Sequence, residues 1–135
     1  MSYNANESEG ETILSRDATS LIGSGLSSAY FRLPSGVSWL SEIAFDAAPN
    51  AVGAVWSIDH AADDTPFWDG GPTDNFAARY TGGLQVETAG SYTFHLTSDD
   101  GSALYLDGER VIDNDGTHPA MTRDVTLDLN AGTHT

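Results

Sequence analysis

Short segments of alternating apolar and polar residues dominate the chain, separated by Gly, Asp, Asn and Pro. The clearest segment is 91–98, in which Tyr92, Phe94 and Leu96 share one face. The polar residues between them, among them His95, share the opposite face, where a solvent or partner contact is expected. No heptad repeat and no long run at helical spacing occurs in the sequence. The pattern therefore predicts an all-β chain.

The same alternation predicts a series of further strands, each bounded by turn residues. They are expected at 29–33, 39–45, 52–58, 76–80, 84–86, 103–106, 109–112, 125–129 and 133–135. Asp107-Gly108 lies between two of them and is a strong signal for a type I′ hairpin. The stretch 59–74 is expected to be a long loop, rich in Asp, and long loops often carry function.

The two ends of the chain differ from its middle. Residues 1–24 are polar and lead into Gly23-Ser24-Gly25, so we expect a linker or loose arm before a domain at 25–135. At the other end, a turn at 130–132 precedes three β-friendly residues, a pattern that normally leads into a strand. We therefore expect a sandwich cut before its last strands; the alternative is a short terminal strand that ends naturally.

Charge excludes several classes of partner. The 135 residues carry a formal net charge of −15, with five Arg, no Lys and no Cys. Such a negative surface repels nucleic acid and anionic lipid, and no apolar run is long enough to span a membrane. Without Cys there is no disulfide and no thiolate zinc site. The excess of Asp over Glu fits solubility, and it also fits calcium, which prefers oxygen ligands.

Asp99-Asp100-Gly101 follows directly after the best strand. Adjacent strand residues point to opposite faces, so two neighbouring carboxylates share one ion only where the backbone departs from that geometry. A cis peptide bond is one such departure, at a cost of roughly 3–4 kcal/mol that a bound divalent ion could offset. The alternative is a solvated Asp-Gly turn, which spacing alone favours.

Other candidate motifs are weaker. Asp113-Asn114-Asp115-Gly116 begins like a calcium loop, but its glycine comes too early for an EF-hand, and a tight turn is the preferred interpretation. The four histidines show no metal-ligand spacing. No nucleophile elbow, zinc helix or phosphate loop is present, and chance pairs of acids are expected at this Asp content. We therefore predict no enzymatic activity.

The segments 90–108 (GSYTFHLTSDDGSALYLDG) and 111–116 (VIDNDG) closely resemble a known family. It is the domain named after the N-terminal region of anthrax protective antigen, the PA fourteen domain. The segments 75–82 and 131–135 match the same family in the same order, and 25–31 resembles its opening strand. The resemblance covers roughly 25–135 and implies an antiparallel β-sandwich.

The resemblance also implies a function. In lectin-like members, found among bacterial adhesins and yeast flocculins, adjacent aspartates joined by a cis peptide hold calcium, and vicinal hydroxyls of a sugar complete the coordination. Asp99 and Asp100 stand at the matching positions, so the resemblance favours them as calcium ligands and carbohydrate contacts. A second ligand loop of the family is missing from this sequence, which leaves most calcium positions to water.

The resulting expectation is a calcium-dependent carbohydrate-binding module of a larger secreted or cell-surface protein. Its partners would be glycans and other domains of the same chain. Two alternatives stay open: a structural spacer domain that binds no glycan, and an accessory domain of a glycoside hydrolase.

Overall fold

The computed structural model describes residues 2–5, 9–14, 19–21, 25–60 and 64–135. Within them the chain forms antiparallel sheets and one short 3₁₀ turn, η1 (Leu40–Glu42). The strands are β1 (Ser2–Ala5), β2 (Glu9–Leu14), β3 (Thr19–Leu21), β4 (Leu26–Arg32), β5 (Ala51–Val55), β6 (Asp59–His60), β7 (Phe76–Thr81), β8 (Leu84–Val86), β9 (Gly90–Asp99), β10 (Ser102–Leu106), β11 (Glu109–Asn114), β12 (Met121–Leu129) and β13 (Gly132–His134).

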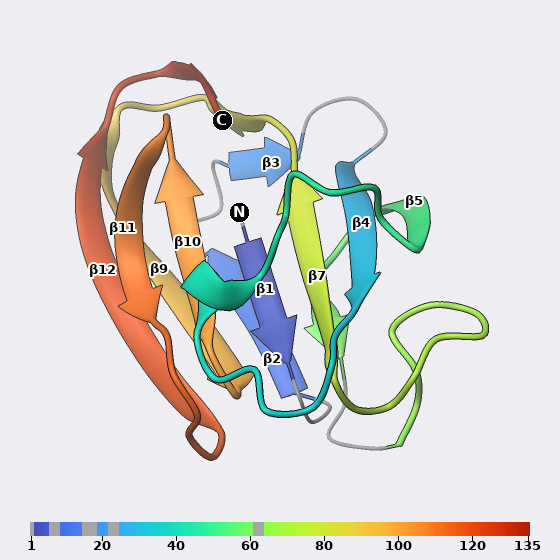
Figure 1. Ribbon diagram of the computed structural model, residues 1–135. Helices are drawn as coiled ribbons and strands as arrows, with labels where there is room; N and C mark the ends of the chain where they lie inside the picture. Colours follow the sequence, from blue (N-terminus) through green and yellow to red (C-terminus); the bar gives the residue numbers. More distant parts are fainter. Residues whose placement is uncertain (1, 6–8, 15–18, 22–24, 61–63) are drawn as a thin grey trace.

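Two large sheets form the layers of a sandwich. The six-stranded sheet has the order β11-β10-β1-β7-β4-β5, and the four-stranded sheet has the order β12-β9-β2-β6. In Figure 1 the first sheet lies in front, and β9 and β2 pass behind it. A third, small sheet of order β13-β8-β3 lies at one end of the sandwich. The predicted antiparallel β-sandwich is confirmed.

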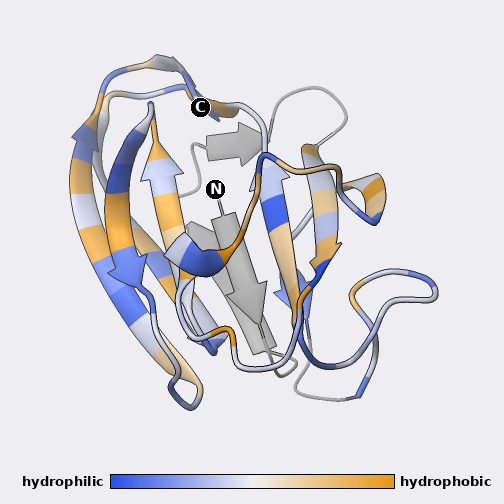
Figure 2. Cartoon of the chain, viewed as in Figure 1, coloured by the Kyte–Doolittle hydropathy of each residue, from blue (hydrophilic) through white to orange (hydrophobic). Residues whose placement is uncertain are grey.

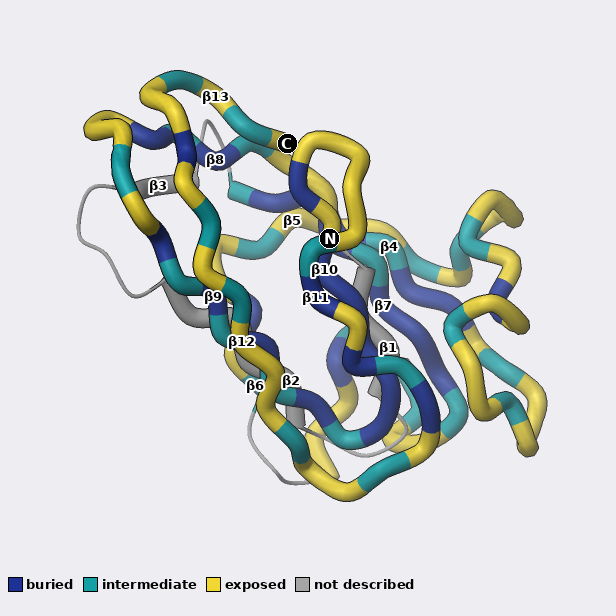
Figure 3. The backbone as a smooth tube through the Cα atoms, turned by 90° about the vertical axis from the view of Figure 1, so that its left-hand side faces the viewer, coloured by how far each residue is buried: buried dark blue, intermediate teal, exposed yellow. Residues whose placement is uncertain are grey.

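The main core lies between these layers. It contains the apolar residues that alternate along the strands of both sheets, including Tyr30, Tyr80, Tyr92, Phe94, Leu96, Leu104 and Ile112. Leu96 and Tyr80 have no exposed surface. The alternation of apolar and polar residues is visible as bands of colour along β12 in Figure 2. Viewed from the side, β7 is mostly buried, whereas β12 has many exposed positions (Figure 3). Period-2 alternation therefore places each strand with one face inward.

A second, smaller core lies on the outer face of the six-stranded sheet. Phe31 and Ala77 project from β4 and β7, and Ile43 covers them from the connection between β4 and β5. This connection contains η1, so the strand expected at 39–45 is wrong. The side chain of Glu42 explains the difference, because its Oε2 accepts the backbone N–H groups of Ser38 and Trp39 at 2.8 and 2.9 Å and stabilises a tight turn.

Most of the other predicted strands are confirmed, with small shifts of their ends. The stretch expected at 52–58 is shorter, since β5 ends at Val55. The hairpin of β10 and β11 turns at Asp107 and Gly108, whose φ values of 52° and 82° are those that a type I′ turn requires. Except for the short β6, the described part of 59–74 contains no strand, and Phe67 within it is buried in the main core.

The N-terminal segment differs from the expected loose arm. Its described parts, β1, β2 and β3, pair within all three sheets, and β1 lies between β10 and β7. Polar composition suggested an arm, but a backbone ladder depends on N–H and C=O groups, which polar residues supply as well as apolar ones. The residues between these strands lie outside the described part of the chain, and the boundary expected at residue 24 stays a prediction.

Candidate functional site

Two Asp-containing turns meet at one end of the sandwich. Asp99 ends β9, and Asp100 and Gly101 connect it to β10. The loop between β11 and β12 lies at the same end of the molecule (Figure 1). A Cβ atom at Gly101 would lie 2.9 Å from Asp115 Oδ1 and 2.9 Å from the backbone nitrogen of Gly116, so the two turns pack too closely for any other residue there. The structure thus joins two motifs that are separate in the sequence.

A buried polar network supports this junction. Ser98 Oγ donates to the backbone oxygen of Asp100 at 2.7 Å and lies 2.6 Å from Ser102 Oγ. Asn114 Nδ2 donates to Ser98 Oγ at 3.0 Å and to the backbone oxygen of Met121 at 3.2 Å. Ser98, Ser102 and Asn114 are almost completely buried. The network therefore connects β9, β10, β11 and β12 beneath the two turns.

One atom of this network has no partner. Asn114 Oδ1 is buried, and no hydrogen-bond donor reaches it among the described residues. An unsatisfied buried acceptor costs roughly 1–3 kcal/mol. Such a cost marks the site as a place where a water molecule or a ligand group would be stabilising.

Asp100 anchors the loop that follows β11. Its side chain is buried, and its Oδ1 accepts the backbone N–H of His118 at 3.1 Å. The two ring nitrogens of His118 lie 2.9 Å from the backbone oxygen of Asn114 and 2.8 Å from that of Pro119. Asp100 and His118 thereby hold the two turns in a fixed relation.

Asp115 ties this end of the sandwich to η1. Its Oδ1 accepts the backbone N–H groups of Leu40, 75 positions away, at 2.9 Å and of Gly116 at 2.8 Å. Gly116 has a φ of +103°, and a Cβ atom there would lie 3.2 Å from the Trp39 ring. The Trp39 indole therefore packs over Gly116, and only glycine suits both the backbone conformation and the close approach.

An open pocket of about 780 Å³ lies beside these turns. Its lining combines an aromatic ring with charged and amide groups, among them Trp39, Asp113, Asn114, Asp115, His118 and Arg123. The indole of Trp39 is 54% exposed, unusual for so large an apolar side chain. The lining is mainly polar, and the Trp39 ring is its large apolar surface.

The predicted calcium ligands are placed differently from one another. Asp99 is half-buried and continues the alternation of β9, so it belongs to the face of His95 and Thr97. Asp100, by contrast, is buried against the loop of His118. No cis peptide bond occurs within the described residues, so the bond between the two aspartates is trans. The departure from strand geometry that the resemblance implies is absent in this conformation.

The two aspartates carry the type of ligand atom that calcium prefers, but they supply too few of these atoms to complete its coordination. Asp99 and Asp100 offer carboxylate oxygens, but a calcium ion takes 6–8 oxygen ligands in all, from carboxylates, carbonyls and water. Nowhere in the described part of the chain do three or more His, Asp or Glu side chains gather in a group that could hold a metal. The chain alone thus supplies a partial set of ligands.

The sequence pattern predicted Asp99 and Asp100 as ligands, which stay predictions, and indicated no role for Trp39 or for the packing of 113–116. Trp39 was assigned to a strand because Trp39, Ile43 and Phe45 are all apolar. In place of the tight turn expected at 113–116, β11 continues to Asn114 and a bend follows, with Asp113 Oδ1 accepting the N–H of Asp115 at 3.2 Å. Its position against Gly101 depends on tertiary packing, and no sequence signal indicates it.

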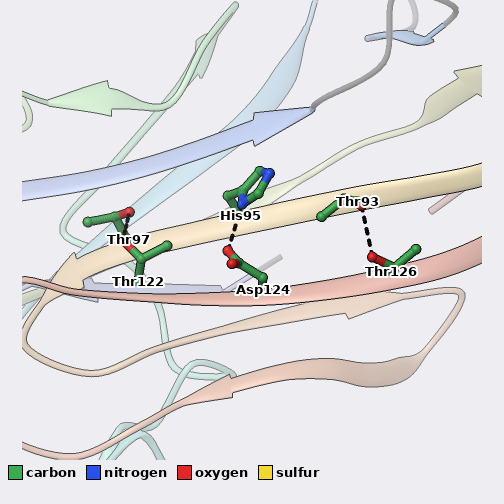
Figure 4. Close-up of polar contacts among 6 residues, drawn as sticks. All are labelled: Thr93, His95, Thr97, Thr122, Asp124 and Thr126. Atoms are coloured by element: carbon green, nitrogen blue, oxygen red, sulfur yellow. Dashed lines mark hydrogen bonds and ion pairs between the residues drawn. The ribbon is translucent and has the colours of Figure 1, made fainter.

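A second polar surface lies on the outer face of β9 and β12. Three cross-strand pairs run along it: Thr93–Thr126 at 2.8 Å, His95–Asp124 at 2.6 Å and Thr97–Thr122 at 2.7 Å between side-chain atoms (Figure 4). Figure 4 shows the three pairs in a row across the two strands. The hydroxyls and the ring satisfy one another, so the row is best explained as sheet stabilisation.

The 59–74 loop, considered for its length, is anchored by aromatic residues. Trp68 stacks on Tyr30 with ring centroids 4.9 Å apart, and Phe67 stacks on His60 at 3.6 Å. Burial of His60 lowers its pKa, while the nearby Asp59 opposes that shift. Aromatic side chains thus attach the described part of this loop to the core.

Comparison with known proteins shows the family of the chain. The family model for the PA14 domain matches residues 36–134, which is most of the chain. PA14 domains occur in carbohydrate-binding, adhesin and glycosidase-associated proteins that are generally secreted or on cell surfaces, as accessory or binding domains that are not themselves catalytic. No curated protein and no solved structure matches the chain significantly. Among the described residues, no helix is long and apolar enough to cross a membrane. The match extends over both Asp-containing turns and over η1, and on this basis the chain belongs to the PA14 domain family.

Proposed function

We propose that the chain is a calcium-dependent carbohydrate-binding module of a larger secreted or cell-surface protein. The observation that carries the proposal is the junction of the two Asp-containing turns beside an open pocket. Family membership supports a binding role, since PA14 domains accompany carbohydrate-binding proteins. The net charge of −15 disfavours phosphorylated or otherwise anionic ligands and leaves neutral sugars as suitable ones.

Asp99 and Asp100 are the residues that would hold the ion. When bound, calcium would supply an electrophilic docking point for two vicinal hydroxyls of a sugar. The contribution of the chain is the rigid base beneath the ion: the Ser98–Ser102–Asn114 network fixes the β9–β10 turn, and the N–H of His118 fixes one carboxylate oxygen of Asp100.

Calorimetry tests the proposal directly. The chain is titrated with methyl α-D-mannopyranoside, methyl β-D-galactopyranoside and methyl α-L-fucopyranoside, first in millimolar calcium chloride and then in excess EDTA. We expect binding of at least one sugar in calcium and its loss in EDTA. Binding unaffected by EDTA contradicts the calcium dependence, and a lack of binding to all three sugars and to a glycan array contradicts carbohydrate binding.

Charge-neutral variants locate the ion. Asp99→Asn and Asp100→Asn keep the shape of the side chain and remove the charge, so each is expected to abolish the increase in melting temperature that calcium causes. Asp128→Asn, on the exposed face of β12, is the matched control and should keep that increase. The calcium-induced shift is the proper measurement, because Asp100 is buried and its replacement lowers stability even without calcium.

A spacer domain is the second candidate, and it is favoured by the placement of Asp100, which is buried against the His118 loop, whereas Asp99 belongs to the face of His95. For a spacer we expect calcium either to have no effect or to raise the melting temperature while every glycan fails to bind. A glycosidase accessory role predicts binding of the polysaccharide that the attached enzyme cleaves.

A further inference from the structure

Trp39 places a large aromatic surface beside the polar pocket. We infer that its indole is the stacking platform for one face of a neutral pyranoside, whose hydroxyls bind the polar groups of the pocket. This inference rests on the proposed carbohydrate binding and assigns the sugar a position within it. Trp39 lines the pocket and is 54% exposed, so its ring is available to a ligand.

The ring is held in place from below and from behind. Below it, Gly116 allows close approach, because a Cβ atom there would lie 3.2 Å from the ring. Behind it, Leu40 N–H donates to Asp115 Oδ1 at 2.9 Å and attaches η1 to the β11–β12 loop. The N–H of Trp39 itself donates to Glu42 Oε2 at 2.9 Å. The backbone around Trp39 is therefore fixed without using the indole, whose exposed surface stays available.

The polar lining supplies both donors and acceptors. Arg123 lines the pocket, is exposed and forms no ion pair with the described residues, so its guanidinium donors are available. Asn114 also lines the pocket, but its Oδ1 is buried, so the exposed carboxylate of Asp113 in the lining supplies the acceptors. Sugar hydroxyls donate and accept hydrogen bonds, so they match a lining of this mixed kind.

The aromatic and polar groups of the pocket together favour one chemical class of ligand. A pyranose ring has C–H groups on its faces, which pack on an indole, and hydroxyls around its edge, which reach polar side chains. Asp113 in the lining pairs with Arg110 at 3.0 Å, so the net charge of −15 is what disfavours an anionic ligand. A neutral pyranoside can stack on the aromatic ring and form hydrogen bonds with both the guanidinium and the carboxylates.

The test measures, by calorimetry, the affinity of three variants for the methyl pyranosides named above. The variants are Trp39→Ala, Trp39→Phe and Trp56→Ala. Trp39→Ala should weaken binding by about tenfold or more, because the stacking surface is lost. Trp39→Phe should restore most of the affinity, because it restores an aromatic face. Trp56→Ala is the control: Trp56 is 69% exposed but is not part of the pocket lining, so its loss should leave the affinity unchanged.

Two results overturn the inference in distinguishable ways. If the parent chain binds a sugar and Trp39→Ala binds it equally well, the platform is wrong and the proposed function survives. If the parent chain binds no sugar, both fail. Should Trp39→Ala fold poorly, acrylamide quenching of the Trp56→Phe chain replaces it. That chain retains Trp39 and Trp68, and Trp39 is the more exposed of the two, so the sugar should reduce the quenching; unchanged quenching on saturation contradicts the platform.

Discussion

Asn114 shows how much a single residue contributes to this site. Its amide nitrogen donates to Ser98 Oγ and to the backbone oxygen of Met121, so one side chain joins β9, β11 and the start of β12. Its neighbour Ser102 adds a longer contact at 3.4 Å. These groups are buried, so each lost donor leaves an acceptor that water does not reach.

Asn114→Ala is expected to lower the free energy of unfolding by about 2–3 kcal/mol, because it removes the donor for Met121 and Ser98 and leaves a cavity. Urea denaturation followed by fluorescence measures the change. Asn130→Ala is the matched control, since the side chain of Asn130 is exposed and only its backbone oxygen contacts His134. Equal stability of the two variants would show that the network contributes little.

At the scale of elements, β9 and β12 form the longest pairing among the described strands, and nine residue pairs join them. In three of these pairs, polar side chains on the outer face are joined by a hydrogen bond: Thr93–Thr126, His95–Asp124 and Thr97–Thr122. Cross-strand pairs of this kind are worth roughly 0.2–1 kcal/mol each. The register of β12, an edge strand with many exposed positions, thus depends partly on this row.

A double-mutant cycle on Thr97 and Thr122 tests that contribution. We expect a coupling energy of about 0.2–1 kcal/mol between Thr97→Ala and Thr122→Ala, since the two hydroxyls lie 2.7 Å apart. The same cycle on Thr97 and Thr126, which are not partners, should give a coupling near zero. Additive free energies for both pairs would mean that the hydroxyl contact contributes nothing to the pairing.

A second link between elements joins β13 to the turn of the β10–β11 hairpin. His134 Nδ1 lies 2.7 Å from Asp107 Oδ2, and its Nε2 lies 2.9 Å from the backbone oxygen of Asn130. The carbonyl of Asn130 and then the carboxylate of Asp107 raise the pKa of His134 above its ordinary value of 6.5. In return, the hydrogen bonds from His134 and from the N–H of Thr135 lower the pKa of Asp107.

This link makes stability depend on pH with a definite sign. The folded chain holds the His134 proton more tightly than the unfolded chain, so its contribution is complete below pH 6.5 and is lost as the pH rises through the folded pKa. His60 acts in the opposite direction: its lowered pKa causes a loss of stability as the pH falls below 6.5.

His134→Gln should therefore lower the unfolding free energy below pH 6.5, where the contribution of His134 is complete, and so flatten the decline above that pH. Urea midpoints measured between pH 5 and 9 provide the comparison. Thr133→Ala, one position away, is the control and should keep the decline of the parent chain. A decline that persists in His134→Gln would show that another group causes it.

At the scale of the whole molecule, charge is the dominant feature. The chain has twenty acidic residues and five arginines, and the resulting net charge of −15 on 135 residues produces mutual repulsion in the folded state. Added salt screens this repulsion, since the Debye length falls to about 10 Å at 0.1 M. Among the residues whose burial the structure describes, the acidic groups are mainly on exposed positions, where screening is effective.

The melting temperature is accordingly expected to rise between 20 and about 300 mM sodium chloride in the presence of EDTA, which removes any contribution of calcium. Sucrose at equal osmolality is the control for effects of solute exclusion that do not depend on charge. A melting temperature that is constant or falls in this range of salt would mean that the acidic residues are already balanced by local contacts.

The sequence predicted the parts of this protein that depend on local patterns. Alternation at 91–98 predicted β9 and its buried face, because a side-chain period of two is a property of the strand itself. Asp107-Gly108 predicted the hairpin for a similar reason, as the turn requires positive φ at both residues. The motif in 90–116 identified the family, which the match over 36–134 confirms.

Only the tertiary structure decided which distant residues meet. Two contacts join segments that are far apart in the sequence: Gly101 packs against Asp115, and the N–H of Leu40 donates to Asp115. No local sequence pattern predicts contacts over such separations. The same limit explains the error at 39–45, where a side-chain cap from Glu42 outweighed apolar spacing. Local periodicity thus determined the strands, whereas the candidate site arose from long-range packing.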